Sequence, residues 1–243
     1  MQTLATPKRG SRFGAARGVI RRRLLVNAVV DPDEAVTRLP PEVRPHITEL
    51  GAVVGCCMLE IEQVRPVGVL AAAGMRLRAA AHRFSVEWDG PAGVPVVGVY
   101  VPVRLTDSRL AAMLGGRAFP GVHRPARIEI VDTANGFTWR VDDGSGEFDI
   151  RVAASVPRGA VVAAASDPVG QTCVGAAVGL SPDHHGRLEA VRMAPDHQLT
   201  QPVAIGDFHS AFLDGFATAA MAPAFLMLDV AVTWTRDAAP ASQ

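Results

Sequence analysis

A two-residue alternation of apolar and polar side chains marks the clearest strand of this chain, over Arg83–Asp89. Phe84, Val86 and Trp88 occupy one face of that strand, and four polar residues, Glu87 among them, occupy the other. Successive side chains of a β-strand point to opposite faces, so the pattern predicts one buried face and one polar face.

The same period runs through Val96–Arg104, where valines at every second position share a face. Tyr100 and Arg104 are expected to share the opposite face of this strand. The pattern therefore predicts that a phenol and a guanidinium project to the same side of the sheet.

Further segments have the apolar content and the flanking turn residues of strands. These segments are Arg22–Val30, Gly51–Val64, Ala126–Val131, Gly136–Asp142, Glu147–Ala154, Gly159–Ala165, Arg187–Met193 and Ala224–Thr235. In the last of them Leu228, Val230, Val232 and Trp234 form an apolar row. Asp229 falls on the opposite face, where it is expected to be solvated or to face an enclosed lumen.

Capping residues predict three short helices among these strands. The helices run from Asp31 to Pro40, from Thr106 to Leu114, and from Asp207 to about Met221. The first has Pro32 at its first helical position, and the second is closed by Gly115-Gly116.

Many strands, few helices and no regular strand–helix alternation predict a mainly β (α+β) protein. A closed or partly open antiparallel β-barrel would remove exposed strand edges and enclose a cavity, with the few helices flanking it. No internal repeat or low-complexity linker divides the chain. We expect a flexible basic tail over residues 1–17, a single domain over 18–236 and a C-terminal tail over 237–243.

Composition narrows the class of protein. The 243 residues are 49% hydrophobic and 20% charged, with a formal net charge of zero. Such a balance gives no general attraction to nucleic acid or to an anionic membrane surface. No apolar stretch reaches the roughly 18–20 residues of a membrane-spanning helix, and the basic start lacks the apolar core of an export signal. The three cysteines show no disulfide spacing, so we expect a cytoplasmic protein, with homo-oligomerisation left open.

Several chemical signatures are missing from the sequence. Gly115-Gly116 and Gly121 do not form a dinucleotide fingerprint, and no phosphate-loop lysine or Gly-x-Ser-x-Gly elbow is present. His184-His185 and His197 lack metal-site spacing and are interpreted as loop residues. Cys56 and Cys57 lie in an apolar run and are interpreted as inert core residues. We therefore expect no cofactor and no metal.

The most distinctive segment is Val99–Arg127, which places cations beside tight turns. A strand delivers Arg104, a capped helix and a Gly-Gly turn follow, and Arg117 then leads into a Pro-Gly turn carrying His123-Arg124. Three guanidinium groups and an imidazole in this arrangement favour the wall of an anion-binding pocket. The alternative is that these arginines are surface charges or structural partners of nearby carboxylates.

The run Gly116–Ala126 resembles the Gly-Arg-Glu-x-x-Gly-Phe-Pro-Lys-Lys motif of the acetoacetate decarboxylase superfamily. It lies in the same context, after a tyrosine-containing strand and a short helix. The resemblance extends from about Arg22 to Trp234. The flanking segments that carry it are Leu25-Val26-Asn27, Val30-Asp31-Pro32, Arg65-Pro66, Ala81-His82-Arg83, Val86-Glu87-Trp88 and Leu226-Met227.

This resemblance implies a β-barrel-like fold around a cavity with flanking helices. In the decarboxylases, the first motif lysine forms a Schiff base and the second lowers its pKa. Here Arg124 and Pro125 occupy those two positions, and Ala118 replaces the motif glutamate. The chain is similar to a branch of the superfamily that lacks the Schiff-base lysine. Its one lysine, Lys8, lies in the predicted tail.

Arginine stays protonated in proteins, so Arg124 cannot form an imine. Arg124 and Arg117 are instead suited to hold a carboxylate or enolate, and His123 is suited to move a proton near neutral pH. A buried Glu60, Glu62 or Glu87 would supply an alternative base. The candidate catalytic residues are His123, Arg124 and Glu87, and the candidate substrate-binding residues are Arg117, Arg104, Tyr100, His82 and Arg65.

Two functional interpretations follow. The first is an enzyme without covalent lysine chemistry, an isomerase, cyclase, hydratase or lyase acting on a small carbonyl or carboxylate compound. The second is a non-catalytic small-molecule binding protein on the same fold. His82 is either a pocket residue or a cap, and the sequence leaves both open.

Overall fold

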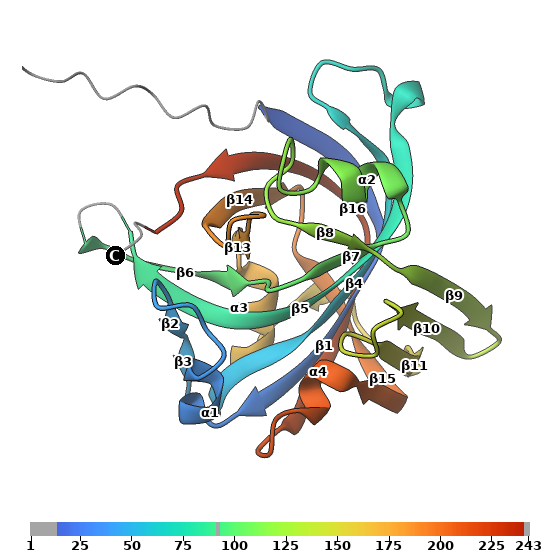
Figure 1. The fold of residues 1–243 in the computed structure, drawn as a ribbon. Helices are drawn as coiled ribbons and strands as arrows, with labels where there is room; N and C mark the ends of the chain where they lie inside the picture. Colours follow the sequence, from blue (N-terminus) through green and yellow to red (C-terminus); the bar gives the residue numbers. More distant parts are fainter. Residues whose placement is uncertain (1–13, 91–92, 241–243) are drawn as a thin grey trace, which may run out of the picture.

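The computed structural model describes residues 14–90 and 93–240, and the predicted mainly β class is confirmed (Figure 1). Strand β1 begins at Ala15, so residues 15–17, which were expected in the tail, pair within the sheet. Lys8 lies outside the described residues. Among the described helices, none is both long enough and apolar enough to cross a membrane.

The elements have the following bounds. The strands are β1 (Ala15–Val30), β2 (Arg44–Pro45), β3 (Ile47–Thr48), β4 (Gly51–Pro66), β5 (Met75–Asp89), β6 (Pro95–Tyr100), β7 (Arg104–Thr106), β8 (His123–Pro125), β9 (Arg127–Thr133), β10 (Gly136–Asp142), β11 (Ile150–Ser155), β12 (Ala163–Ala164), β13 (Val178–Pro182), β14 (Leu188–Pro195), β15 (Leu199–Ser210) and β16 (Ala220–Asp237). The helices are α1 (Pro32–Val36), α2 (Arg109–Leu114), α3 (Pro168–Gly175) and α4 (Ala211–Asp214), with a 3₁₀ turn at Ala71–Ala73.

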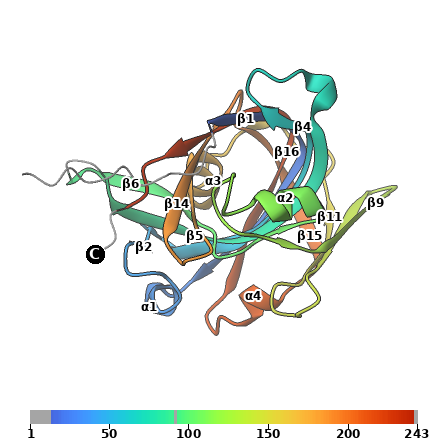
Figure 2. The same cartoon turned by 45° about the horizontal axis from the view of Figure 1, so that its top comes forward.

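The sheet closes into a ring of strands. Neighbours pair in the order β1-β4-β5-β6-β13-β14-β16, and β16 pairs back with β1. All these pairings are antiparallel except the short β6–β13 contact, which is parallel. Figure 2 shows α2 lying over the opening of this ring. Closure removes the exposed edges that an open sheet of this size would present.

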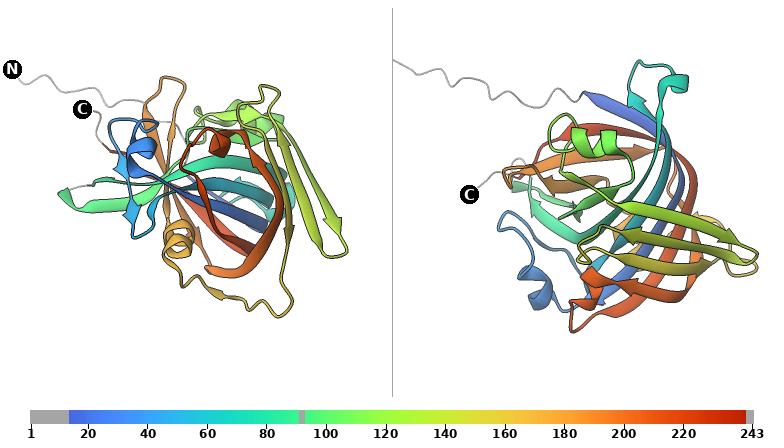
Figure 3. Two further views of the ribbon diagram at one scale, coloured as in Figure 1. Left: turned by 90° about the horizontal axis from the view of Figure 1, so that it is seen from below. Right: turned by 45° about the vertical axis from the view of Figure 1, so that its right-hand side comes forward.

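A second layer packs outside the ring. Strand β15 pairs with β16 and continues through β11 and β10 to β9, and this extension crosses the outer surface of the ring (Figure 3). Between the two layers lies the larger apolar core, which includes Leu24, Met58, Phe84 and Trp139. These side chains belong to strands of both layers, so the extension holds the outer face of the ring away from water.

The inner face of the ring forms a smaller core. Strand β4 shows the division, because Cys56 and Met58 contact the outer core whereas Cys57 and Ile61 contact the inner one. Helix α3 packs against β16 and contributes Val174 to the inner cluster. The two-residue period of the strands therefore assigns alternate residues to the two cores.

The inward-facing row shifts by one residue where three strands pass each other. Gln63 and Asp229 both adopt positive φ, at 55° and 53°, and the β1–β4 register shifts next to Arg21. Arg21 forms ion pairs of 2.9 Å with both Glu62 and Asp229 across this line. Extra residues of this kind interrupt the pleat and redirect the side chains that follow.

Because of this shift, the apolar row expected in the last strand, Leu228, Val230, Val232 and Trp234, is wrong at Leu228. Leu228 is 41% exposed, whereas Val230 and Val232 are buried in the inner cluster together with Met227. Strict alternation placed Leu228 with Val230, but Asp229 breaks the alternation between them. Asp229 itself is solvated, with its side chain 69% exposed.

Two other predicted elements are wrong. The helix predicted from Asp207 to about Met221 is reduced to the four residues of α4, since β15 continues to Ser210 and β16 begins at Ala220. Pairing of β15 with β11, for example Ile150 with Ser210, outweighs the local helical preference. The strand predicted over Gly159–Ala165 is reduced to the two residues of β12.

Helix α3 was not predicted. Asp167 caps it by accepting a hydrogen bond from the Gly170 amide, and Pro168 occupies its first position. These are ordinary helix-start signals. The glycine- and alanine-rich composition that follows concealed the helix.

Candidate functional site

The ring encloses a cavity of about 220 Å³. Most of its wall is apolar, with side chains from strands β4, β5, β6 and β16 and from α2. Representative wall residues are Leu59, Leu77, Val99, Val101, Leu114 and Trp234. An engineered apolar cavity of about 150 Å³ binds benzene, so this volume is sufficient for a small organic molecule.

Four basic side chains interrupt the apolar wall, namely Arg23, Arg83, Arg104 and His123. Within the described ranges, no aspartate or glutamate lines the cavity. Burying a guanidinium group without a counter-charge is costly, and proteins normally pair such groups. The cavity is therefore electropositive and suited to an anionic ligand.

Arg104 and His123 are brought together by short parallel strands. Strand β7 lies between β5 and β8, with Arg104 opposite Ala81 on one side and opposite His123 on the other. The Arg104 Nε donates a 3.0 Å hydrogen bond to the Ser181 hydroxyl of β13. Burial lowers the pKa of Arg104 to about 10, so the group remains charged at neutral pH.

His123 is a neutral imidazole at neutral pH. Burial lowers its pKa to about 4, and the charge of Arg104 adds to this effect. Its Nδ1 lies 2.9 Å from the Gly121 carbonyl oxygen, which can only accept a hydrogen bond. The proton therefore belongs on Nδ1, and Nε2 keeps a lone pair that can accept a proton.

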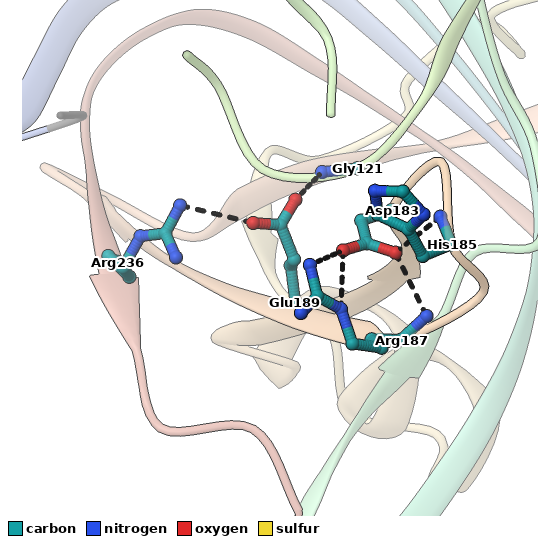
Figure 4. A network of polar contacts seen from close by, with 6 residues as sticks. All are labelled: Gly121, Asp183, His185, Arg187, Glu189 and Arg236. Carbon is teal, nitrogen blue, oxygen red and sulfur yellow. Dashed lines mark hydrogen bonds and ion pairs between the residues drawn. The ribbon is translucent and has the colours of Figure 1, made fainter. Parts of the chain in front are cut away.

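The turn that carries His123 is held by the β13–β14 hairpin (Figure 4). Gly121 has a φ of +81°, and its amide donates a 2.9 Å hydrogen bond to Glu189 Oε2. The other carboxylate oxygen of Glu189 accepts from Arg236 at 3.2 Å. Ser181 and Glu189 are cross-strand partners, so one pair of positions orients both Arg104 and the His123 turn.

The hairpin turn itself is closed by Asp183. This carboxylate accepts from the His185 amide at 2.7 Å and from the Arg187 guanidinium at 2.6 Å (Figure 4). The Asp183 side chain is 6% exposed, so these donors replace the water it has lost. The closed turn keeps β13 and β14 in register beneath Gly121.

Of the predicted cationic cluster, the structure brings only Arg104 and His123 to the cavity. Arg124 is exposed, and its guanidinium lies 5.5 Å from the centre of the Phe148 ring. Arg117 is also exposed and donates to the Met113 carbonyl at 2.9 Å. The side chains of β8 alternate, so the inward position of His123 turns its neighbour Arg124 outward.

Tyr100 does not share a face with Arg104. It is 9% exposed in the outer core, whereas Val101 and Arg104 line the cavity. Strand pairing stops after Tyr100 and resumes at Arg104, and Pro102 lies in the interruption. This break between β6 and β7 resets the alternation on which the expectation rested.

His82 is likewise an outer-core residue. It is fully buried, its Nε2 lies 3.2 Å from the Ser210 hydroxyl, and its ring packs 4.7 Å from that of Phe212. Its neighbours on β5, Ala81 and Arg83, face the cavity instead.

The remaining candidates lie outside the cavity wall. Glu87 forms a 2.7 Å ion pair with Arg44, and this hydrogen bond is the main reason that the pKa of Glu87 falls below its ordinary value. Arg65 donates to the carbonyls of Val69 and Gln63. Glu62 is held by Arg21 and Arg76, and Glu60 lies 3.9 Å from Arg78.

Sequence reasoning did not identify Arg23 and Arg83. The alternation of Arg83–Asp89 did place Arg83 opposite the apolar row, which was a usable signal. Arg23 lies in an arginine run and carries no comparable mark. Only the pairing of β1 with β4 shows that it faces inward, beside Cys57.

Comparison with known proteins gives a fold but no sequence family. No family model and no curated protein matches the chain. Among solved structures, acetoacetate decarboxylase from Legionella pneumophila matches with a TM-score of 0.62 and 13% identity, over 93% of this chain and 88% of that one. An acetoacetate decarboxylase-like enzyme from Sphingomonas wittichii RW1 has a TM-score of 0.59 and 13% identity, over 98% and 99%.

A third similar structure is the enduracididine biosynthesis enzyme MppR complexed with pyruvate. It matches with a TM-score of 0.58 and 14% identity, over 94% of this chain and 90% of that one. At such identities the likeness establishes a shared fold. The acetoacetate decarboxylase-like architecture expected from the sequence is thereby confirmed.

Proposed function

We propose that this protein binds a small carbonyl compound bearing a carboxylate and catalyses proton transfer at the carbon next to the carbonyl. The reaction class is that of an isomerase, cyclase, hydratase or lyase working without a Schiff base. One observation carries the proposal: a neutral imidazole and a partly buried guanidinium, which has no carboxylate partner among the described residues, lie side by side on the wall of the cavity.

Arg104 supplies the binding contribution. Its Nε is occupied by Ser181, and one terminal nitrogen, Nη2, lies beside the bare backbone of Gly179 at the cavity wall. A planar guanidinium recognises a carboxylate or an enolate oxygen through charge-assisted hydrogen bonds. Folding has already removed much of the water around Arg104, so an anion that binds there gains a strong partner at little further desolvation cost to the guanidinium.

His123 supplies the proton transfer. The carbon–hydrogen bond beside the carbonyl breaks, its proton moves to Nε2, and the electron pair passes to the carbonyl oxygen. Arg104 then stabilises the resulting enolate, and the imidazolium returns the proton to the same or another carbon. A bound anion also raises the proton affinity of the neighbouring imidazole, because opposite charges attract.

Lysine chemistry is absent from this proposal. Lys8 is the single lysine of the chain, and the described cavity wall consists of other residue types. MppR and acetoacetate decarboxylase share the fold, and MppR binds pyruvate, which supports a small carbonyl ligand. Borohydride reduction in the presence of acetoacetate is expected to leave the protein mass unchanged.

The test is exchange of substrate protons for deuterium in D₂O, followed by NMR over a panel of 2-keto and 3-keto acids. Wild type is expected to exchange at least one panel member faster than buffer, and His123→Gln to lower that rate by about 10²-fold or more. Arg124→Gln is the matched control, because that exposed residue contacts Phe148 and should leave the rate unchanged.

Equal exchange by wild type and His123→Gln would refute the assigned role of the imidazole. Saturable ligand binding without exchange would instead favour a non-catalytic binding protein on the same fold. That alternative is supported by the largely apolar wall, which supplies binding area but few reacting groups.

A further inference from the structure

Two further arginines of the cavity remain unexplained by the proposed reaction. Arg23 of β1 is 8% exposed and Arg83 of β5 is 3% exposed, and both line the cavity. Charged side chains are almost never buried to this degree unless they are paired. Their positions therefore call for a counter-charge.

The hydrogen-bond partners of Arg23 are poor. Its Nε donates to the Cys57 sulfur at 3.4 Å, and one terminal nitrogen donates to the Met227 sulfur at 3.7 Å. Thiol and thioether sulfurs are weak acceptors, whereas a guanidinium offers five N–H donors. Arg23 thus retains donors directed at the cavity without strong acceptors.

The partners of Arg83 are neutral and incomplete. It donates to the Asn27 side-chain oxygen and to the Cys173 carbonyl, the latter at 3.4 Å, while its Nε is buried without a hydrogen-bond partner. An unsatisfied buried N–H on a charged group costs free energy comparable with a lost hydrogen bond.

These two arginines are held by different partners from those of Arg104. Arg23 and Arg83 are anchored on β1, β4, β16 and α3, whereas Arg104 is anchored on β13 through Ser181. The cavity therefore holds three guanidinium groups and, among the residues described, no carboxylate. A ligand with one negative charge would leave most of this charge uncompensated.

We propose that Arg23 and Arg83 form a second anion subsite and that the natural ligand is a small keto acid with two anionic groups, a keto dicarboxylate. One carboxylate or enolate contacts Arg104 beside His123, and the second carboxylate contacts Arg23 and Arg83. This inference rests on the proposed function, whose substrate class it narrows. The volume of about 220 Å³ suits a short carbon chain between the two groups.

The experiment compares ligands that differ only in the second carboxylate. Dissociation constants of 2-oxoglutarate and 2-oxopentanoate are measured on wild type by isothermal titration calorimetry. These acids have the same chain length, and only the first ends in a second carboxylate. A hydrogen bond to a charged group is worth about 1.5–3 kcal/mol, so 2-oxoglutarate is expected to bind about 10- to 150-fold more tightly. A ratio near one would overturn the proposal.

Two variants test whether Arg23 causes the preference for 2-oxoglutarate. Arg23→Met removes the charge at similar volume and is expected to bring the ratio close to one while 2-oxopentanoate still binds. Arg124→Met, at an exposed position, is the matched control and should keep the wild-type ratio. An unchanged ratio in Arg23→Met would also refute the subsite. Because the wild-type ratio needs no variant, the test stands even if a cavity substitution impairs folding.

Binding and exchange separate the two proposals. A preference for the dicarboxylate without deuterium exchange would retain the second subsite and reject the proton-transfer function. Exchange of a monocarboxylate with no dicarboxylate preference would do the reverse.

Discussion

The buried imidazole of His82 makes an acid-sensitive contribution to stability. Burial lowers its pKa to about 3, against an ordinary value near 6.5, and Asp143 opposes this shift only weakly. The folded protein therefore binds fewer protons here than the unfolded chain. The stabilisation is complete above pH 6.5 and is lost as pH falls from about 6.5 toward 3.

The magnitude follows from linkage. Between pH 7 and pH 5, the unfolded imidazole gains most of a proton while the folded one remains neutral, so unfolding becomes easier by about 2 kcal/mol. Carboxylates with lowered pKa values, such as Glu62 and Glu87, lose their contribution only at lower pH. The window from pH 5 to pH 7 therefore reports chiefly on buried histidines.

The assay is urea unfolding at pH 7, 6 and 5 for wild type and His82→Gln. Glutamine does not titrate and can still hydrogen-bond Ser210, so the variant should lose about 2 kcal/mol less between pH 7 and pH 5 than wild type does. His209→Gln, at an exposed position, is the matched control for loss of a histidine. An unchanged pH dependence in His82→Gln would show that this imidazole is not held neutral.

Three further predictions follow from the cavity and its supports. Gly121→Ala should destabilise the fold more than Gly144→Ala. Both glycines have positive φ, which costs an added side chain about 1–2 kcal/mol at either position. Only a Cβ at position 121 would also clash with Ser181, at 2.6 Å. Equal losses of unfolding free energy for the two variants in urea would contradict this prediction. Cys57 is the one cysteine on the cavity wall, so it should react with an alkylating reagent before Cys56 and Cys173 do, and bound ligand should slow its reaction. Peptide mass spectrometry would identify the labelled cysteine. Preferential labelling of another cysteine would be inconsistent with the fold. Glu189→Ala should lower the free energy of unfolding by about 1–3 kcal/mol and weaken keto-acid binding in calorimetry, because the Gly121 amide loses its acceptor. Glu189→Gln should restore part of the stability and of the affinity. If Glu189→Ala changed neither quantity, a positioning role for Glu189 would be excluded.

The amino-acid pattern alone determined the class of the fold. Alternating strands, short capped helices and frequent turn residues identified a mainly β protein whose strands enclose a cavity. The sequence also singled out the turn-rich segment through Arg104 and His123 but left open whether its cations line a pocket, and of these cations Arg104 and His123 line the cavity whereas Arg117 and Arg124 are exposed. These results depend on local periodicity and turn chemistry, which are properties of neighbouring residues.

Tertiary structure decided which face of each strand the cavity meets. The interruption at Pro102 turned Tyr100 away from Arg104, and the irregularity at Asp229 moved Leu228 out of the inner row. Arg23 and Arg83 line the same cavity because β1 and β5 both pair with β4. The two-residue period determines which face of the sheet a side chain occupies only within an unbroken strand. Where the pleat is interrupted, and which distant strands become neighbours, depends on cross-strand pairing and ring closure.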